Sequence, residues 1–392
     1  ADKDAFRDAA LDTHQKVLEA PMKETLNTYG TAALVNVINE TGMFPTDNFQ
    51  QSQFEGTSKI SGETLRDTLL LREKGCFGCN IACGRVSEVT NPKYQGIGEG
   101  PEYENIWALG SDVGVDDLEA LTKANFLCNE LGMDPISAGA SIACAMELSE
   151  KDYLPISDSE KPLKFGDQDL LIELLEKAAR REGFGAILAD GSARMAEKYG
   201  HPELFMGVKG QEFPAYDGRG AQGIGLAYAT ANRGACHVRA YTIAVEVLGS
   251  PELIDRTATD QKAFWTIAFQ NTTAAWDSTG ICLFTSFMIG LDEVAAMLNA
   301  ATGQDTTAES LLQTGDRIWN LEKIFNLRAG ITGADDKLPE RITDEGIPEG
   351  PSEGMVNRLP EMLPEYYEMR GWAADSIPTS EKLTELGLQD YA

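Results

Sequence analysis

The stretch Cys76-Phe77-Gly78-Cys79-Asn80-Ile81-Ala82-Cys83 places three of the chain's seven cysteines within a single turn-forming run. Thiols are rarely packed this densely for structural reasons alone, because thiolates are reactive and easily oxidised. A Cys-x2-Cys-x3-Cys spacing bends readily around one small inorganic group, and Gly78 permits a close turn of the backbone. The run therefore predicts a metal or cluster site rather than a pair of buried thiols or a disulfide.

Two centres fit such a run, zinc and an iron–sulfur cluster. Zinc needs a fourth sulfur or nitrogen ligand at short spacing, but the next cysteine is Cys128 and the chain's histidines are His14, His201 and His237. An iron–sulfur cluster is held by cysteine thiolates that need not all be neighbours in sequence. The spacing favours the cluster and leaves several candidates for a distant fourth ligand, which are Cys128, Cys144, Cys236 and Cys282.

Composition excludes several classes of protein. A chain of 392 residues is long enough for two or three domains with their own cores. Its net charge of −29 argues against nucleic acid or an anionic membrane as partner, because both need a basic face. No apolar run approaches the roughly 20 residues of a membrane span. The clustered, odd number of cysteines indicates a reducing, cytoplasmic compartment, and the first residues show no targeting segment.

Apolar periodicity predicts a mainly helical chain. Asp117 and Gly132 are typical of the start and the end of one amphipathic helix, and Pro21 and Gly42 interrupt and end another helical region. A change of composition at 200–212 predicts two domains, 1–207 and 208–392. The expected helices cover 5–41, 117–131, 137–149, 167–183, 190–198, 260–276, 291–302 and 307–327, and a short helix from 61 leads into the cysteine run.

Two loops share the pattern polar-x-x-Gly-x-polar, one in each predicted domain. The first runs from Asn129 to Asp134 and the second from Asp277 to Cys282. Aspartate oxygens accept hydrogen bonds from ring N–H groups of the pterin type. The repetition predicts two equivalent halves of a ligand site, although a plain helix stop at Gly280 is the simpler alternative for the second loop.

A glycine-dense loop, Gly218-x-Gly220-x-x-Gly223, matches the dinucleotide fingerprint as text. That fingerprint requires a buried strand before it, and the preceding Phe-Pro-Ala-Tyr-Asp is not one. We expect instead a loop whose glycines let the backbone approach a bulky ligand.

The candidate acid–base groups have unusual neighbours. On an extended segment, two carboxyl groups two residues apart point the same way. One histidine lies between Arg233 and Arg239, which favours an anion-handling site over a purely structural role. The candidate acid–base residues are therefore Glu102, Glu104, Tyr216 and His237.

Together these motifs resemble the tungsten-dependent aldehyde:ferredoxin oxidoreductases, over essentially the whole chain. The matching motifs are Cys76-x2-Cys79-x3-Cys83, Gly-Pro-Glu102-Tyr-Glu104, Ala-Tyr216-Asp217-x-Arg219-Gly220, Arg-Gly-Ala-Cys-His237, Asp277-x-x-Gly-x-Cys282 and the tail Leu363-Pro364-Glu365-Tyr366-Tyr367.

The resemblance implies a mainly α fold of two helical domains that pack on a separate, N-terminal β-rich domain, which forms the pterin base. It implies oxidation of aldehydes to carboxylic acids, with electrons passed to ferredoxin or to a dedicated iron–sulfur subunit, in a homo-oligomer without nucleic acid or membrane. The cofactors would be a [4Fe–4S] cluster and a tungsten bis-molybdopterin, with molybdenum as the alternative metal and a Mg²⁺ ion bridging the pterins.

Site residues follow from the same resemblance. It implies that the cluster ligands are Cys76, Cys79, Cys83 and Cys282. It implies that the pterin contacts are Asn129, Asp134, Arg239, Asp277, Ile281 and Cys282. A glutamate, Glu104 by spacing or else Glu102, would lie near the metal with His237, and Tyr216 would orient the aldehyde oxygen.

Three departures qualify the resemblance. Asn129 stands where the family usually has aspartate, Gly218 replaces the usual proline of Asp-Pro-Arg-Gly and loosens that loop, and the β-rich domain is missing. Two alternatives stay open: a related tungsten enzyme that reduces an aromatic acyl-thioester with a protein cysteine on the metal, and an iron–sulfur electron-transfer subunit without its own catalysis. A radical enzyme would need Cys-x3-Cys-x2-Cys, the reverse order.

Overall fold

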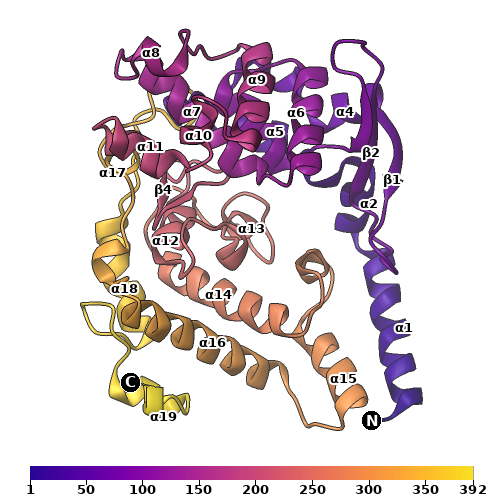
Figure 1. The fold of residues 1–392 in the computed structure, drawn as a ribbon. Coiled ribbons are helices and arrows are strands. Elements are labelled where there is room, and N and C mark those ends of the chain that lie inside the picture. The colour runs from indigo at the N-terminus through magenta and orange to yellow at the C-terminus, as the bar shows by residue number, and fades with distance from the viewer. Residues whose placement is uncertain (392) are drawn as a thin grey trace. The chain divides into compact units, whose positions relative to one another are not determined.

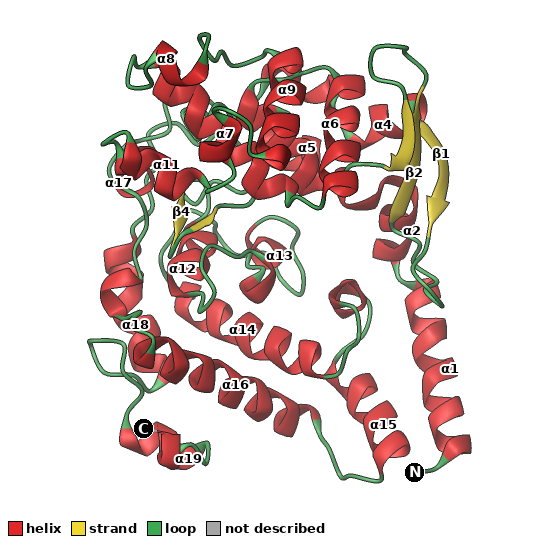
Figure 2. Cartoon of the chain, in the orientation of Figure 1, coloured by secondary structure: helices red, strands yellow, loops and turns green. Residues whose placement is uncertain are grey.

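The computed structural model describes residues 1–391, which fold mainly into helices with a few short strands (Figures 1 and 2). The predicted mainly α fold is therefore confirmed. The chain forms two compact units, and each unit is built from stretches that are not consecutive in sequence. Unit 1 comprises 1–24, 222–337 and 358–392, and unit 2 comprises 25–221 and 338–357. The sequence placed its domain boundary at residue 207, whereas these units divide between Ala221 and Gln222, and each also takes in segments from elsewhere in the chain.

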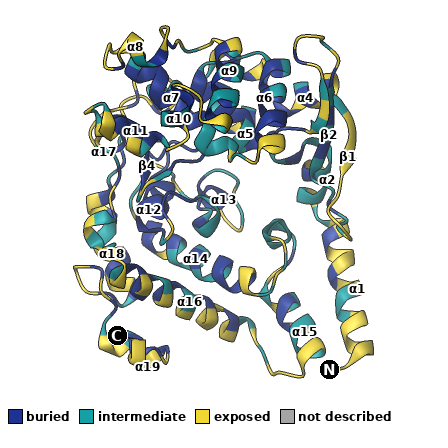
Figure 3. Cartoon of the chain, in the orientation of Figure 1, coloured by how far each residue is buried: buried dark blue, intermediate teal, exposed yellow. Residues whose placement is uncertain are grey.

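Helices α6 and α7 form the centre of unit 2 and are largely buried (Figure 3). The Asp117 carboxylate accepts hydrogen bonds from Glu119 N and Ala120 N at the start of α6, and Gly132 ends the helix with a left-handed φ of 71°. A β-carbon on Gly139 of α7 would lie 2.2 Å from the carbonyl oxygen of Ala108 on α5. The absence of a side chain at Gly139 thus lets the backbones of α5 and α7 approach closely.

The helices of unit 2 differ widely in length. They are α3 (Leu34–Glu40), α4 (Gly62–Thr68), α5 (Tyr103–Leu109), α6 (Leu118–Leu131), α7 (Pro135–Glu150), α8 (Ile156–Ser159), α9 (Gln168–Arg180), α10 (Gly185–Leu188), α11 (Ser192–Lys198) and α17 (Glu340–Thr343), while α2 (Pro21–Tyr29) crosses from one unit to the other.

A three-stranded antiparallel sheet in unit 2, order β1-β2-β3, was not predicted from the sequence. It comprises β1 (Leu70–Lys74), β2 (Gly84–Val89) and β3 (Gly96–Glu99), and a separate hairpin joins β4 (Gly207–Val208) to β5 (Gln211–Glu212). Strand β2 alternates buried and half-buried residues. The glycines of β3 lie against Phe126 of α6, because a β-carbon on Gly98 would be 2.8 Å from that ring.

A buried ion pair attaches the segment 338–357 to unit 2. The Arg341 guanidinium binds both oxygens of the Glu147 carboxylate, at 2.8 and 2.6 Å, and its Nη1 also donates to the Asn48 carbonyl at 2.7 Å. The Asn48 amide donates to the same carboxylate at 2.6 Å. Because a bidentate arginine with extra hydrogen-bond partners compensates its desolvation well, this contact fixes the loop at 46–49.

Unit 1 is built around the antiparallel pair α14 and α16. A β-carbon on Gly315 of α16 would lie 1.9 Å from the carbonyl oxygen of Asn271, so the two helices are in backbone contact. The helices are α1 (Lys3–Glu19), α12 (Gln222–Thr230), α13 (Ile243–Glu246), α14 (Lys262–Ser278), α15 (Leu291–Thr302), α16 (Ala308–Arg328), α18 (Leu359–Arg370) and α19 (Ser380–Glu385).

The tail of the chain closes unit 1 through a buried polar network. Arg370 donates to Asp316 at 2.9 Å and to Gln270 at 2.5 Å, and the Tyr366 hydroxyl donates to the same amide oxygen at 2.7 Å. The Trp372 indole donates to Asn320 at 2.7 Å. Tyr366 and Trp372 thus attach the tail to the helices of unit 1.

Most predicted helices match observed ones within a few residues, and α2 begins at Pro21, where the periodicity was interrupted. Within residues 1–391, no helix is long and apolar enough to cross a bilayer.

Candidate functional site

The three neighbouring cysteines lie on the loop that closes the β1–β2 hairpin. Lys74 pairs with Gly84 at the base of this loop, and Cys79 N donates to Cys76 O at 3.0 Å to form its tight turn. Gly78 has φ 71° and a β-carbon there would meet no atom within 4 Å, so the turn faces open space. Cys76 is exposed, and Cys79 and Cys83 are half-buried.

The base of this loop is held by the last turn of α2 and by Gly30, which follows it. The Asn27 amide donates to Ile81 O at 3.2 Å, and a β-carbon on Gly30 would lie 2.8 Å from Cys83 O. Buried Arg85 donates to Leu26 O and Asn27 O, which fixes the strand immediately after the last cysteine. The cysteine run is therefore a positioned loop with outward-facing sulfurs.

The predicted likeness of the two polar loops is present in their backbones. Each follows a long helix and contains a left-handed glycine, Gly132 with φ 71° after α6 and Gly280 with φ 74° after α14. In the first loop, Asp134 begins α7 and accepts from Ile136 N at 3.0 Å, and Asn129 is exposed. No atom lies within 4 Å of a β-carbon on either glycine. The loops thus present polar side chains outward by the same local geometry.

The second loop carries Cys282 and an arginine contact. The Trp276 indole donates to Cys282 O at 3.2 Å, while the Cys282 thiol is free and exposed and Ile281 is half-exposed. Arg239 Nε lies 3.7 Å from the Asp277 carboxylate, and its Nη1 lies 3.4 Å from Glu322. Arg239 and Asp277 are therefore in contact within unit 1, at the start of the loop that carries Cys282.

The expectation that Glu102 and Glu104 point the same way on an extended segment is wrong. Glu102 is the residue before α5 and Glu104 lies in its first turn, so their side chains leave the backbone in different directions. Glu102 accepts a short hydrogen bond from the Thr31 hydroxyl, whereas Glu104 accepts from Ala215 N at 2.8 Å. The sequence pattern around Glu102 did not reveal that a helix begins at Tyr103.

Glu104 and Tyr216 are brought together in unit 2. Tyr103 links them, since its hydroxyl donates to Ala215 O at 2.6 Å and its ring lies 5.2 Å from the Tyr216 ring. Burial, with a smaller contribution from the negative charge of Asp134, raises the pKa of Glu104 to about 8 against the lowering effect of the Ala215 N–H. Burial also raises the pKa of Glu102, while Thr31 lowers it.

The glycine-dense loop is fastened to its own unit, contrary to the expectation that its glycines face a bulky ligand. A β-carbon on Gly220 would lie 2.4 Å from the Met43 side chain. Arg219 and Asp217 form a buried ion pair at 2.7 Å, and Ser52 donates to the same carboxylate at 2.6 Å. The Asp-x-Arg-Gly motif thus forms a buried ion pair that fixes the loop next to Tyr216.

His237 is half-exposed in unit 1, next to buried Cys236. The Arg233 guanidinium donates to the Cys236 sulfur through Nε at 3.1 Å and Nη2 at 2.9 Å. Burial and the charge of Arg233 lower the pKa of His237 to about 3, so its imidazole is neutral at physiological pH. The Tyr241 ring lies 6.3 Å from it.

Three contributing residues were not found from the sequence: Thr31 at Glu102, Ala215 at Glu104 and Glu322 at Arg239. Each acts across a long sequence separation, and no spacing pattern marks them. Among residues 1–391, no set of three or more histidine, cysteine and acidic side chains is arranged to hold one metal ion. A cubane cluster places one thiolate on each of several irons, so the cysteine loop does not need such an arrangement.

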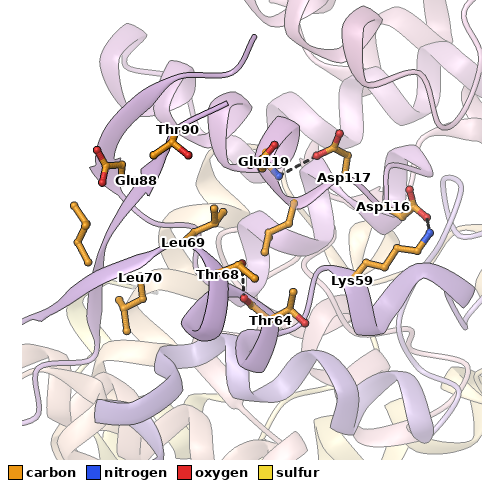
Figure 4. Close-up of a pocket in the computed structure, with 12 residues that line it drawn as sticks. Lys59, Thr64, Thr68, Leu69, Leu70, Glu88, Thr90, Asp116, Asp117 and Glu119 are labelled. Carbon is orange, nitrogen blue, oxygen red and sulfur yellow. Dashed lines mark hydrogen bonds and ion pairs between the residues drawn. The ribbon is translucent and has the colours of Figure 1, made fainter. Parts of the chain in front are cut away.

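Two hollows of the surface include candidate site residues: one of about 420 Å³ in unit 1 is lined by Arg239 and Glu322, and one of about 400 Å³ in unit 2 is lined by Asp134. Another hollow, of about 470 Å³ in unit 2, is lined by threonines and carboxylates, with Lys59 paired to Asp116 at its rim (Figure 4). None of the candidate site residues lines it.

Residues 8–388 match the family model described as aldehyde ferredoxin oxidoreductase, domains 2 and 3, and the chain belongs to this family.

The relatives carry the same family name. The chain is 48% identical over 398 residues to the tungsten-containing aldehyde ferredoxin oxidoreductase of Pyrococcus furiosus and 46% identical to that of Thermococcus kodakarensis, in each case over 100% of this chain. It spans only 65% of the length of these relatives. A WOR-like subunit of an aliphatic sulfonate oxidoreductase of P. furiosus is 28% identical over 93% of this chain and 58% of its own length.

The fold is also similar to a solved active site complex of benzoyl coenzyme A reductase in complex with 1,5-dienoyl-CoA. The TM-score is 0.72 over 92% of this chain and 60% of that chain, at 19% identity, so this likeness shows the fold alone.

Proposed function

We propose that this chain is the cluster-binding and substrate-facing part of an enzyme that oxidises aldehydes to carboxylic acids. The observation that carries the proposal is the outward-facing cysteine loop on its braced hairpin, in a chain whose relatives are named as tungsten-containing aldehyde ferredoxin oxidoreductases. In the reaction, an aldehyde and water yield a carboxylic acid, two protons and two electrons.

The residues present fit the cofactors that this function needs. Cys76, Cys79 and Cys83 offer thiols on one loop, and Cys282 offers another in the second polar loop; these four are the proposed ligands of a [4Fe–4S] cluster. Tungsten held by two molybdopterins, with molybdenum as the alternative and Mg²⁺ between the pterins, would supply the redox chemistry.

The two polar loops are the proposed pterin contacts. Asn129 and Asp134 present oxygens on the exposed surface of unit 2, and Asp277 and Ile281 lie in the matching loop of unit 1. Arg239 is kept beside Asp277 by Glu322, so a cation and an acceptor are available at the same loop.

Glu104 is the proposed proton acceptor. Its pKa of about 8 lets it hold or release a proton near neutral pH, which suits the removal of a proton from water that adds to the aldehyde carbon. It is also bonded to the residue before Tyr216, the proposed contact of the aldehyde oxygen. Glu102 is committed to Thr31 and lies near Arg85 behind the cysteine loop, which supports Glu104 over Glu102.

His237 has a different proposed role from that of a proton acceptor. Because its pKa is lowered to about 3, it acts as a neutral imidazole that accepts or donates one hydrogen bond. It would hold the substrate or a nearby water in place while Glu104 takes the proton.

Ferredoxin or a dedicated iron–sulfur subunit is the proposed electron acceptor. The net charge of −29 would repel an acidic carrier, so we expect reduction of such a carrier to be slower at low than at high ionic strength. Faster reduction at low salt would indicate a basic docking patch or a basic partner instead.

Reduction of an aromatic acyl-thioester is the second candidate function. It is supported by the buried Cys236 thiol, which lies beside His237 and is bonded to Arg233, since a cysteine near the metal distinguishes that chemistry. Tungsten X-ray absorption that shows a protein sulfur ligand, lost in Cys236→Ser, would favour it over aldehyde oxidation.

Metal analysis of the anaerobically purified protein tests the proposal. We expect tungsten or molybdenum, about four irons per chain, and aldehyde-dependent reduction of a low-potential dye. Cys282→Ser should lower the iron content, whereas Cys144→Ser, which removes a buried thiol, should not. Equal iron content in the two variants would reject Cys282 as a ligand, and absence of tungsten and molybdenum would reject the aldehyde chemistry.

A further inference from the structure

Two carboxyl groups outside the proposed site lie on neighbouring loops of unit 2. Asp47 belongs to the loop that follows α3, and Asp112 to the short helical turn after α5. The loops are joined by their backbones, since Asp47 N donates to Ser111 O and Asn48 N to Asp112 O, both at 3.1 Å. These backbone contacts bring the half-buried Asp47 beside the buried Asp112, close enough for the charge of Asp47 to raise the pKa of the Asp112 carboxyl group.

Neither carboxyl group has the partners that burial requires. The side chain of Asp112 is 0% exposed, and both of its oxygens are buried without a hydrogen-bond partner among the described residues. Asp47 Oδ1 is buried without a partner as well. A buried charge left in this state costs several kcal/mol, so a proton or a cation must compensate it.

Nearby groups compensate the buried charge only in part: burial and the charges of Asp47 and Glu147 raise the pKa of Asp112 well above its ordinary value, although the Asn48 N–H and the charge of Arg341 lower it. The Arg341 guanidinium binds Glu147 and contacts Glu345, and Lys151 lies 3.6 Å from Glu147. The negative charge of Glu150 adds to burial in raising the pKa of Asp47 to about 6. The surroundings of the pair therefore hold more acids than bases.

The backbone at Asp47 is strained and fixed from both sides. Asp47, Asn48 and Phe49 have consecutive positive φ angles of 52°, 56° and 62°. Each such residue costs roughly 1–2 kcal/mol in an L-amino acid. Arg341 binds Asn48 O and Arg219 binds Phe49 O, each at 2.7 Å, and these contacts hold the turn that places Asp47 next to Asp112.

A wide hollow of about 870 Å³ leads from the surface to Asp47. Its lining includes no lysine, arginine or histidine, and its other polar side chains are carboxylates, amides and hydroxyls. The carboxylates are Glu40, Asp47, Glu55 and Glu349. Oxygen donors without a basic residue attract hard cations and give them a path to the buried pair.

We propose that Asp47 and Asp112 bind a hard divalent cation of the Ca²⁺ or Mg²⁺ class, independently of the proposed oxidation. Two carboxylates supply the charged ligands, and backbone carbonyls and water from the hollow complete the shell. Ca²⁺ suits the irregular set of ligands better than Mg²⁺, which demands a near-octahedral shell. The ion would tie the loop after α3 to the turn after α5.

Equilibrium dialysis of ⁴⁵Ca²⁺ against chelator-treated protein tests the site, with thermal unfolding in CaCl₂, MgCl₂ or NaCl of equal ionic strength. We expect Asp112→Asn to lose one ion per chain and the Ca²⁺-dependent rise in Tm, and Glu182→Gln, which changes an exposed glutamate of the same unit, to keep both. Ions bound elsewhere on the protein contribute equally to both variants, so the difference in bound Ca²⁺ between the variants reports this site alone.

Two results would overturn the proposal. Equal Ca²⁺ and Mg²⁺ binding in the wild type and in Asp112→Asn would show that the ion binds elsewhere or not at all. A variant Asp112→Asn that is more stable than the wild type in chelator and in Ca²⁺ alike would show that the pair shares a proton instead. If Asp112→Asn fails to fold, Asp47→Asn, at the half-exposed partner, takes its place.

Discussion

Replacing Glu104 with glutamine should stabilise the protein at high pH and remove its activity at the same time. The carboxyl group is held by Ala215 N, and burial raises its pKa from the ordinary 4.5 to about 8. The folded state therefore keeps a proton between these two values that the unfolded state has lost. Stability falls as pH rises through this interval and levels off above the folded pKa.

The size of the effect follows from the shift. At about 1.36 kcal/mol per pKa unit, a rise from 4.5 to about 8 has an upper limit of about 5 kcal/mol. Because the side chain is half-buried, water screens part of this figure. We expect the wild type to lose roughly 2 kcal/mol relative to Glu104→Gln between pH 6 and pH 9.

Urea midpoints at pH 6 and pH 9 measure the difference, with Glu182→Gln as the exposed control in the same unit. Aldehyde-dependent dye reduction by Glu104→Gln should fall by about 10²–10⁴-fold, the usual contribution of a general base. A constant difference in stability at the two pH values would refute the raised pKa. Full activity would refute the role of Glu104, and would leave Glu102 as the candidate to test.

Three further perturbations probe the scaffold. Arg341→Met should destabilise unit 2 by about 3 kcal/mol in urea, because it leaves Glu147 buried and unpaired, and adding Glu147→Leu should recover most of the loss. Gly315→Ala should cost at least 1–3 kcal/mol in urea, because its β-carbon would overlap Asn271 O. Acidification from pH 7 to pH 4 should lower the Tm of the wild type more than that of His237→Gln, because folding must keep an imidazole neutral that the unfolded chain protonates near 6.5.

Control substitutions at exposed positions separate these effects from nonspecific loss of stability. Arg180→Met on exposed α9 and Gln313→Ala on the exposed face of α16 should each change stability by less than about 0.5 kcal/mol. A double variant of the ion pair no more stable than Arg341→Met would contradict the unpaired-charge explanation. Parallel acid profiles for the wild type and His237→Gln would contradict the lowered pKa.

Local sequence signals were sufficient for most helices. Asp117 and Gly132 marked the ends of α6, and Pro21 marked the start of α2, because capping oxygens, left-handed glycines and missing N–H groups act within a few residues. The sheet was missed because β1 carries mostly charged and exposed residues and β3 contains two glycines, so neither shows the alternation of a strand.

By itself, the sequence determined the cysteine run, the two polar loops and the family, since each depends on residue types at fixed short spacings. Only the tertiary structure decided which glutamate accepts a hydrogen bond from Ala215 N and that Asp217 and Arg219 form a buried ion pair. It also decided that the side-chain oxygens of Asp112 are buried without a hydrogen-bond partner among the described residues. Burial and long-range contacts set the proton affinity of a side chain, and both are created only when distant segments pack together.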